Sequence, residues 1–162
     1  MNLNDIKVKV DNVIKWCLIV IMAAMTINVL WQVFTRFILQ NPSSYTEELA
    51  RYMLIWLGIL GASYVAGQKM HLAIDLLSLK LKGKSKSYLE IFIQSLIFFF
   101  SLFVMVIGGF NLVQITLSLN QISAALQVPL GYVYAIVPVS GLIMMFYSSI
   151  FIIDEMKKLK SI

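Results

Sequence analysis

The residues of this chain that could act together chemically are Glu47, Glu48 and Arg51. The two glutamates precede Arg51 by four and three residues, which is the spacing and order that favour ion pairing along one helix face. Arg36 lies one predicted helix earlier, and a hairpin of the two helices would bring it near the same carboxylates. We interpret the four residues as an ion cluster. A structural role explains it more simply than a coupling role, because both carboxylates stand at a predicted helix start.

No other combination of residue types predicts catalysis or metal binding. The chain has a single His, His71, and a single Cys, Cys17, so paired haem ligands and a dithiol pair are excluded. Packing is the expected role of Cys17. Neither a Gly-rich phosphate loop nor a Ser-His-Asp or metal-ligand set is present. We therefore predict that the protein is not an enzyme and has no catalytic residues, no metal site and no cofactor.

Long uncharged stretches define the predicted elements. Residues 91–153 contain no Asp, Glu, Lys, Arg or His. At about 1.5 Å per helical residue and roughly 20 residues per crossing, this stretch supplies two transmembrane helices. Two more apolar helices precede it. We predict an all-α membrane protein with one domain over residues 1–162, a single helix bundle with spans at 13–39, 45–66, 88–119 and 129–153.

Local signals place the ends and bends of these helices. Ser44 and Glu47 have the spacing of a capping box, in which each side chain bonds the backbone N–H of the other. Pro129 suits the first turn of the fourth span. Pro138 falls inside that span, so a kink is expected there.

The first span carries a polar face formed by Asn28, Gln32, Thr35 and Arg36, which recur at spacings of three and four. Such a face should point toward protein, because amides and a guanidinium are costly against lipid. Interhelical hydrogen bonding is the favoured explanation, and a transport pathway is the alternative.

The second span carries small residues at every fourth position, namely Gly58, Ala62 and Ala66. A ridge of small residues lets another helix backbone approach closely. We predict that these residues pack against a partner helix.

The net charge of +5 does not indicate nucleic acid, because the basic residues follow the membrane topology. Lysines precede the first span, separate the second from the third and follow the fourth, whereas the opposite side has only Arg36 and Arg51. By the positive-inside rule both termini are cytoplasmic. Residues 71–82 are predicted to form a short amphipathic helix at that interface. The lysines expected to contact anionic phospholipids are Lys80, Lys82, Lys84 and Lys86.

One segment and its flanks resemble a known family. The segment is Ser43-Ser44-Tyr45-Thr46-Glu47-Glu48-Leu49-Ala50-Arg51-Tyr52, followed by Trp56, Gly61-Ala62 and His71-Leu72-Ala73-Ile74-Asp75. It is similar to the small membrane subunit (DctQ-like, Q subunit) of tripartite ATP-independent periplasmic (TRAP) transporters.

The resemblance implies a multi-pass subunit of the bacterial inner membrane that works with a large multispan subunit and a periplasmic solute-binding protein. In that family the large subunit carries the sodium and organic-acid sites, and the small one braces its stationary scaffold. The substrate, whether a dicarboxylate, sialic acid or another sugar acid, is not specified by this chain. Two alternatives stay open: a stand-alone carrier or channel acting as a homo-oligomer with Asn28, Gln32 and Arg36 along its pore, and a non-transporting membrane assembly factor.

Overall fold

The computed structural model describes residues 3–41, 43–68 and 84–161, and within them the predicted four-span, all-α architecture is confirmed. The spans are Asp5–Phe37, Ser44–Gly67, Lys84–Ser118 and Leu130–Lys160. They are built from α1 (Leu3–Phe37), α2 (Ser44–Gly67), α4 (Lys84–Phe100), the π-helical segment η1 (Ser101–Gly108), α5 (Gly109–Ser118), α6 (Leu130–Tyr134) and α7 (Ile136–Ser161). The predicted interfacial helix at 71–82 lies outside the described residues.

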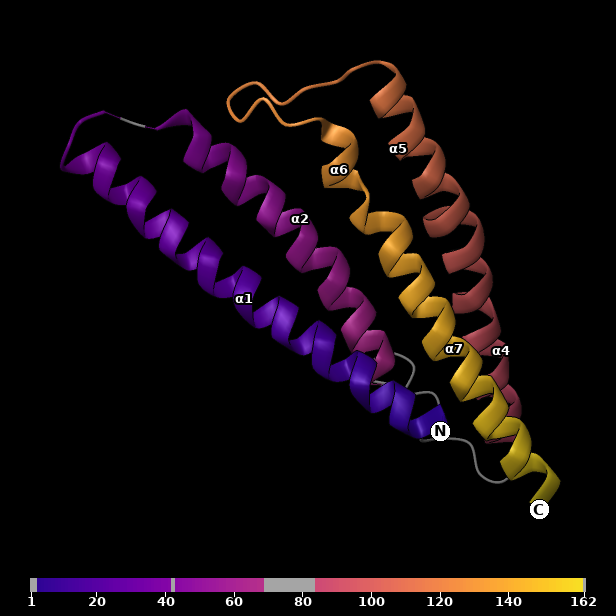
Figure 1. Cartoon of the computed structure of the whole chain (residues 1–162). Helices are drawn as coiled ribbons and strands as arrows, with labels where there is room; N and C mark the ends of the chain where they lie inside the picture. Colours follow the sequence, from indigo (N-terminus) through magenta and orange to yellow (C-terminus); the bar gives the residue numbers. More distant parts are fainter. Residues whose placement is uncertain (1–2, 42, 69–83, 162) are drawn as a thin grey trace.

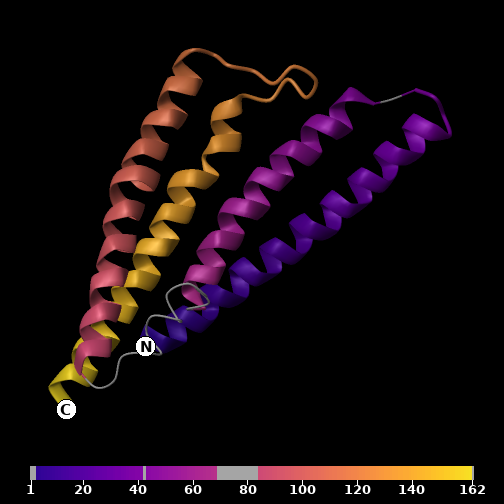
Figure 2. The ribbon, with the colours of Figure 1, turned by 180° about the vertical axis from the view of Figure 1, so that it is seen from behind.

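The four spans of the single predicted bundle stand side by side in a row. Helix α1 packs against α2, α2 against α7, and α7 against α4 and η1. Figures 1 and 2 show this order from two opposite sides. The spans form two hairpins, one of α1 and α2 and the other of α4–η1–α5 and α6–α7. These hairpins converge at the end that holds both termini and diverge toward the other end (Figure 1). Inside lipid the hydrophobic effect does not force helices to close a bundle, so an open row is a stable arrangement.

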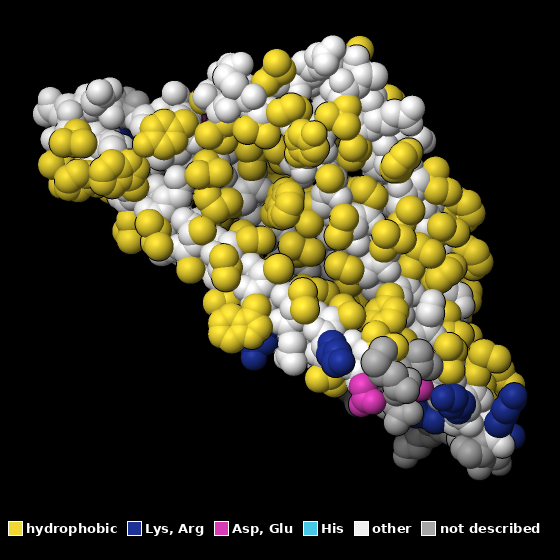
Figure 3. All heavy atoms as spheres, viewed as in Figure 1, with side chains coloured by type: hydrophobic (Ala, Val, Ile, Leu, Met, Phe, Trp, Pro, Cys, Tyr) yellow, Lys and Arg dark blue, Asp and Glu magenta, His cyan; other side chains and the backbone are white. Residues whose placement is uncertain are grey.

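This open arrangement leaves broad apolar surfaces uncovered. Trp16 is 65% exposed and Phe103 is 60% exposed, and Cys17 also faces outward rather than packing inside this chain. Hydrophobic side chains cover most of the face shown in Figure 3, while basic side chains gather mainly at the end with the termini. Both distributions suit a protein surrounded by lipid and by partner helices.

The fourth span bends where the sequence predicts it. Helix α6 ends at Tyr134 and α7 begins at Ile136. Pro138 lacks the N–H that would bond the Tyr134 carbonyl, and its ring crowds that carbonyl, so the helix breaks one turn before the proline. Pro129 directly precedes the first helical residue rather than lying in the first turn. A Cβ added at Gly109 would lie 2.9 Å from Pro138 Cδ, so the third and fourth spans touch closely at the bend.

Candidate functional site

Glu48 makes the most hydrogen bonds of the four residues in the predicted ion cluster. One carboxylate oxygen accepts hydrogen bonds from the Tyr52 hydroxyl at 2.6 Å and the Ala124 N–H at 3.2 Å. The other oxygen accepts from the N–H groups of Ala125 at 2.8 Å and Leu126 at 2.9 Å. Three consecutive backbone donors thus form a concave anion site, and a carboxylate from another helix fills it. Glu48 thereby fixes the connection between α5 and α6, residues 119–129, which we call the outer loop, to α2.

The other three members of the cluster do not join Glu48. Arg51 contacts Glu47 at 3.5 Å, and both side chains are about two-thirds exposed. Arg36 lies over the ring of Phe37 at 5.9 Å and makes no ion pair with the rest of the described chain. An exposed, stretched pair contributes little stability. Arg51 thus pairs with Glu47, while the outer loop takes up Glu48.

The predicted capping box at Ser44 is wrong. Ser43 is the N-cap of α2, and the Thr46 hydroxyl donates to the Ser43 carbonyl at 2.8 Å. The Glu47 carboxylate extends toward Arg51 instead of back to the helix start.

The polar face of α1 forms one of its expected interhelical hydrogen bonds. The Asn28 amide donates to the Thr46 carbonyl of α2 at 2.7 Å. Thr35 is buried, and its hydroxyl donates to the Gln32 carbonyl within α1 itself. Asn28 therefore supports the structural explanation of this face.

The outer loop is closed by its own backbone as well as by Glu48. Ser123 is 2% exposed. Its N–H donates to the Val128 carbonyl at 2.9 Å, and its hydroxyl accepts from the Val128 N–H at 3.2 Å. The Leu130 N–H bonds the Gln121 carbonyl at 2.9 Å. Asn120 and Gln127 adopt positive φ angles of 49° and 56°, which turn the chain at either end of this unit.

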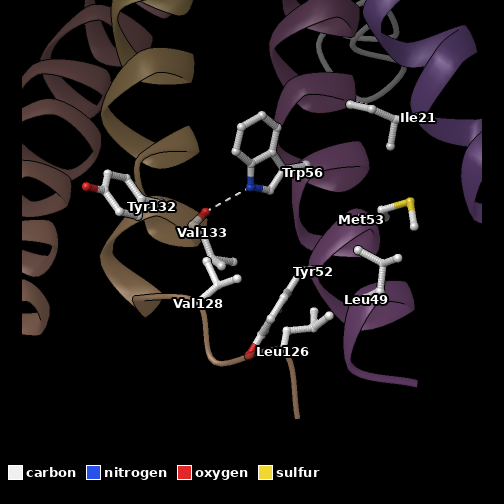
Figure 4. A pocket seen from close by; sticks show the side chains of 9 residues that line it. All are labelled: Ile21, Leu49, Tyr52, Met53, Trp56, Leu126, Val128, Tyr132 and Val133. Atoms are coloured by element: carbon white, nitrogen blue, oxygen red, sulfur yellow. Dashed lines mark hydrogen bonds between the residues drawn. The ribbon is translucent and has the colours of Figure 1, made fainter. Parts of the chain in front are cut away.

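An apolar groove of about 290 Å³ lies beside the loop, with α2 contributing the largest share of its lining (Figure 4). The Trp56 indole N–H crosses to the Val133 carbonyl of α6 at 3.0 Å, and the Tyr52 hydroxyl is bonded to Glu48. Both polar atoms are therefore satisfied within the chain, and the groove offers contact to apolar groups. Its lining residues are Ile21, Leu49, Tyr52, Met53, Trp56, Leu126, Val128, Tyr132 and Val133.

A second polar cluster joins the hairpins at the end with the termini. Asp11 accepts hydrogen bonds from Lys7 at 2.8 Å, from Gln68 at 3.2 Å and from the Tyr147 hydroxyl. The Lys7 ammonium also lies 5.5 Å from the Tyr147 ring centroid. Sequence reasoning missed this cluster. The spacing of Lys7 and Asp11 predicts their pair, but nothing in the sequence indicates the contacts with α2 and α7.

The three small residues of α2 have different surroundings. Gly58 and Ala62 face outward, and a Cβ built at Gly58 would meet nothing within 4 Å beyond the backbone of its own helix. Ala66 is 6% exposed and is covered by this chain's own helices. The ridge that a partner helix could reach in this chain is therefore Gly58 and Ala62.

Among the predicted membrane anchors, Lys84 and Lys86 are exposed at the start of α4. Lys80 and Lys82 lie outside the described residues. Over residues 3–41, 43–68 and 84–161 the structure holds no group of His, Cys, Asp or Glu side chains that could bind a metal ion.

Comparison with known proteins assigns the chain to a family. Residues 25–158 match the family described as "Tripartite ATP-independent periplasmic transporters, DctQ component". The chain belongs to the DctQ family. This family is a membrane subunit of transporters rather than an enzyme family, and its members are inner-membrane proteins.

Three relatives agree with this assignment. A TRAP transporter small permease protein of Haemophilus influenzae is 28% identical over 123 residues, covering 76% of this chain and 74% of the relative. The sialic acid TRAP transporter small permease SiaQ of Vibrio cholerae is 29% identical over 53% of this chain and 50% of its own length. The sialic acid TRAP transporter permease SiaT of Haemophilus influenzae is 26% identical over 71% of this chain but only 18% of its own length. The chain is thus a TRAP small permease.

Proposed function

We propose that this small permease braces the stationary scaffold of the large subunit in a sodium-driven, binding-protein-dependent importer of an organic acid. The observation that carries the proposal is the open row of four spans. A row one helix wide buries little of its own apolar surface and offers long faces to a neighbouring membrane protein. An elevator-type transporter needs a stationary part against which its mobile domain moves, and such a row can widen that part.

The placement of ionisable residues supports a bracing role. Residues 91–153 carry no charged side chain. In the first two spans the polar clusters described above lie toward the helix ends, around Asp11 at one end and Glu48 at the other. Sites that couple ions to substrates within a membrane are generally built from ionisable or polar groups deep in the spans. We therefore assign the sodium and substrate sites to the large subunit.

The relative SiaT supports direct association with that subunit. The part of SiaT similar to this chain is a small fraction of a much longer permease. When two transporter subunits are joined in one chain in a relative, the corresponding separate subunits are good candidates for direct contact. The names of SiaT and SiaQ give sialic acid, a carboxylated sugar, as their substrate, which favours an organic acid for this system.

The orientation of the chain in the membrane and its contacts with phospholipids follow from the positions of its basic residues. We assign both termini to the cytoplasm, where Lys84 and Lys86 contact anionic phospholipids. The end with the outer loop is then periplasmic and faces the solute-binding protein. Gly58 and Ala62 are the positions assigned to close contact with a helix of the large subunit.

Reconstitution tests the proposal. Proteoliposomes that contain this chain alone should show no sodium-driven uptake of organic acid. Adding the large subunit and the solute-binding protein should produce uptake. Full activity of the large subunit without this chain, or uptake by this chain alone, would overturn the bracing role.

A further inference from the structure

We propose that the π-helical segment η1 is a two-register joint in the third span, which lets α5 turn about its axis while α4 stays in place. In one register Gly109 packs against the bend of the fourth span, and in the other its neighbour Gly108 takes that position. The inference is independent of the bracing role, because it concerns motion within this chain alone.

The buried positions of the third span reveal one extra residue in η1. These positions, which we call the seam, are Ser87, Gln94, Ser101, Gly109 and Thr116. Successive members lie seven residues apart, except that Ser101 and Gly109, on either side of η1, lie eight apart. Seven residues are about two turns of α-helix, and the wider turns of a π-helix take up the additional one. All members are small or polar, the residue types that join helices in a membrane.

Contacts with the fourth span define the register seen here. A Cβ built at Gly109 would lie 2.9 Å from Pro138 Cδ, so this register requires glycine against the rigid proline ring. A Cβ built at Gly108 would lie 3.6 Å from the Phe103 carbonyl oxygen of its own helix, which is an ordinary contact. The observed register therefore excludes alanine at Gly109 and tolerates it at Gly108.

The sequence also fits a second register at both outer positions of the seam. If η1 became regular α-helix, α5 would turn by one residue, which is about 100°. Gly108 would then replace Gly109 against Pro138, and the glycine requirement would still be met. Ile115, which is 56% exposed, would replace Thr116, which is 2% exposed. One β-branched side chain would thus take the place of another of similar shape.

The observed register leaves a buried polar group unpaired. Ser101, the first residue of η1, is 0% exposed, and its hydroxyl has no hydrogen-bond partner among the described residues. An unpaired buried hydroxyl is unfavourable, and π-helical turns are rare and frequent at functional sites. Both features bring the observed register closer in free energy to its α-helical alternative, as a two-state element requires.

The reactivity of single cysteines distinguishes the two registers. In the full chain with Cys17→Ser, the rate of reaction with N-ethylmaleimide is measured for Ile115→Cys and for Thr116→Cys, each relative to the denatured chain. The buried cysteine reacts only while α5 is in the second register. For a minor state populated at roughly 10% or less, Thr116→Cys should react at about a tenth of the rate of Ile115→Cys or slower.

Gly109→Ala and Gly108→Ala are matched variants with opposite expected effects. Gly109→Ala blocks the observed register, so Thr116→Cys should become the faster of the two cysteines and Ile115→Cys the slower. Gly108→Ala blocks the second register, so the labelling of Thr116→Cys should fall further. Continued protection of Thr116→Cys in folded Gly109→Ala, loss of protection at both positions, or unchanged labelling in Gly108→Ala would overturn the joint.

A deletion tests the same joint if Gly109→Ala does not fold. Deleting Val104 removes the extra residue, so a regular α-helix keeps the whole seam on one face. This variant should retain the unfolding temperature of the unmodified chain and slow the labelling of Thr116→Cys, because a single register remains. Deleting Leu96, which is 54% exposed like Val104, is the control and should lower the unfolding temperature strongly, because it displaces half of the seam. Equal damage from the two deletions would contradict the extra residue and with it the joint.

Discussion

At the scale of single residues, neighbouring glutamates of like chemistry have different roles. Glu48 is bound by four donors from two parts of the chain, whereas within the described residues Glu47 pairs only with Arg51, at the surface. An amide in place of the Glu48 carboxylate cannot accept at both ends, so at least one loop N–H loses its partner.

Glu48→Gln should therefore unfold at a lower temperature in detergent and expose the outer loop to protease. Glu47→Gln is the control and should keep both the unfolding temperature and the protease resistance of the unmodified chain. Equal behaviour of the two variants would contradict the assignment of the loop contacts to Glu48.

Asp11 and Tyr147 provide a second prediction at this scale. Their hydrogen bond links α1 to α7 beside the small core in which Ile14 packs with Tyr147 and Phe151. Asp11→Asn and Tyr147→Phe should each lower the free energy of unfolding, and the double variant should lose less than the sum. A coupling energy on the order of 1 kcal/mol is expected for a direct contact. Strictly additive losses would show that the two side chains act independently.

The sequence identifies Glu48 as a candidate but not its partners. Ion-pair spacing on a helix directs attention to Arg51, because that rule considers only side chains on one helix. The actual donors are backbone N–H groups of Ala124, Ala125 and Leu126. Their side chains carry no polar signal, and they lie more than 75 positions away along the chain. No local pattern could have indicated them.

At the scale of helices, the glycines of α2 show which parts of this helix pack inside the chain and which face outward. A Cβ added at Gly67 would lie 2.6 Å from the Tyr147 ring, whereas Gly58 has open space around it. Gly67→Ala should lower the free energy of unfolding by about 1–3 kcal/mol through overpacking. Gly58→Ala should change it by less than about 1 kcal/mol. Denaturation of the isolated chain in detergent measures both, and a tolerant Gly67 would contradict the close approach of α2 and α7.

Hydropathy and proline chemistry predicted the helices well because they act locally. The four spans and the bend before Pro138 follow from runs of apolar residues and from one missing donor. The boundaries were less accurate: α1 begins at Leu3 rather than near residue 13, because a helix can continue into charged residues beyond the membrane. Periodicity also predicted outward small residues on α2, but it could not show that Ala66 is covered by the chain itself.

At the scale of the whole molecule, the order of the spans could not be derived from sequence. Each span is apolar on all sides, so no apolar stripe distinguishes a lipid-facing side from a packed one. Small polar residues contribute to the contact between the two hairpins. One example is Ser63, whose hydroxyl contacts the Ser140 carbonyl at 3.4 Å. Serines of this kind are compatible with many helix pairs, which explains why the row was not predicted.

The orientation in the membrane gives a prediction for the whole molecule. In a Cys17→Ser background, Gln121→Cys should react with an impermeant thiol reagent applied from the periplasm, and Ser85→Cys should not. Both positions are exposed in the structure, so access depends on the side of the membrane alone. The reverse labelling pattern would place the termini outside and contradict the positive-inside assignment.

The last prediction concerns the surface that meets the large subunit. Gly58 and Ala62 are exposed in this chain, and bulky side chains there have room in the isolated protein. Gly58→Ile combined with Ala62→Ile should therefore leave the unfolding temperature of the isolated chain almost unchanged. The same double variant should lose copurification with the large subunit, because two branched side chains would hold the partner backbone away from α2. Leu54→Ala, a change on the same helix that removes bulk instead of adding it, serves as the control and should keep the partner bound. Normal copurification of the double variant would move the interface to another face of the row.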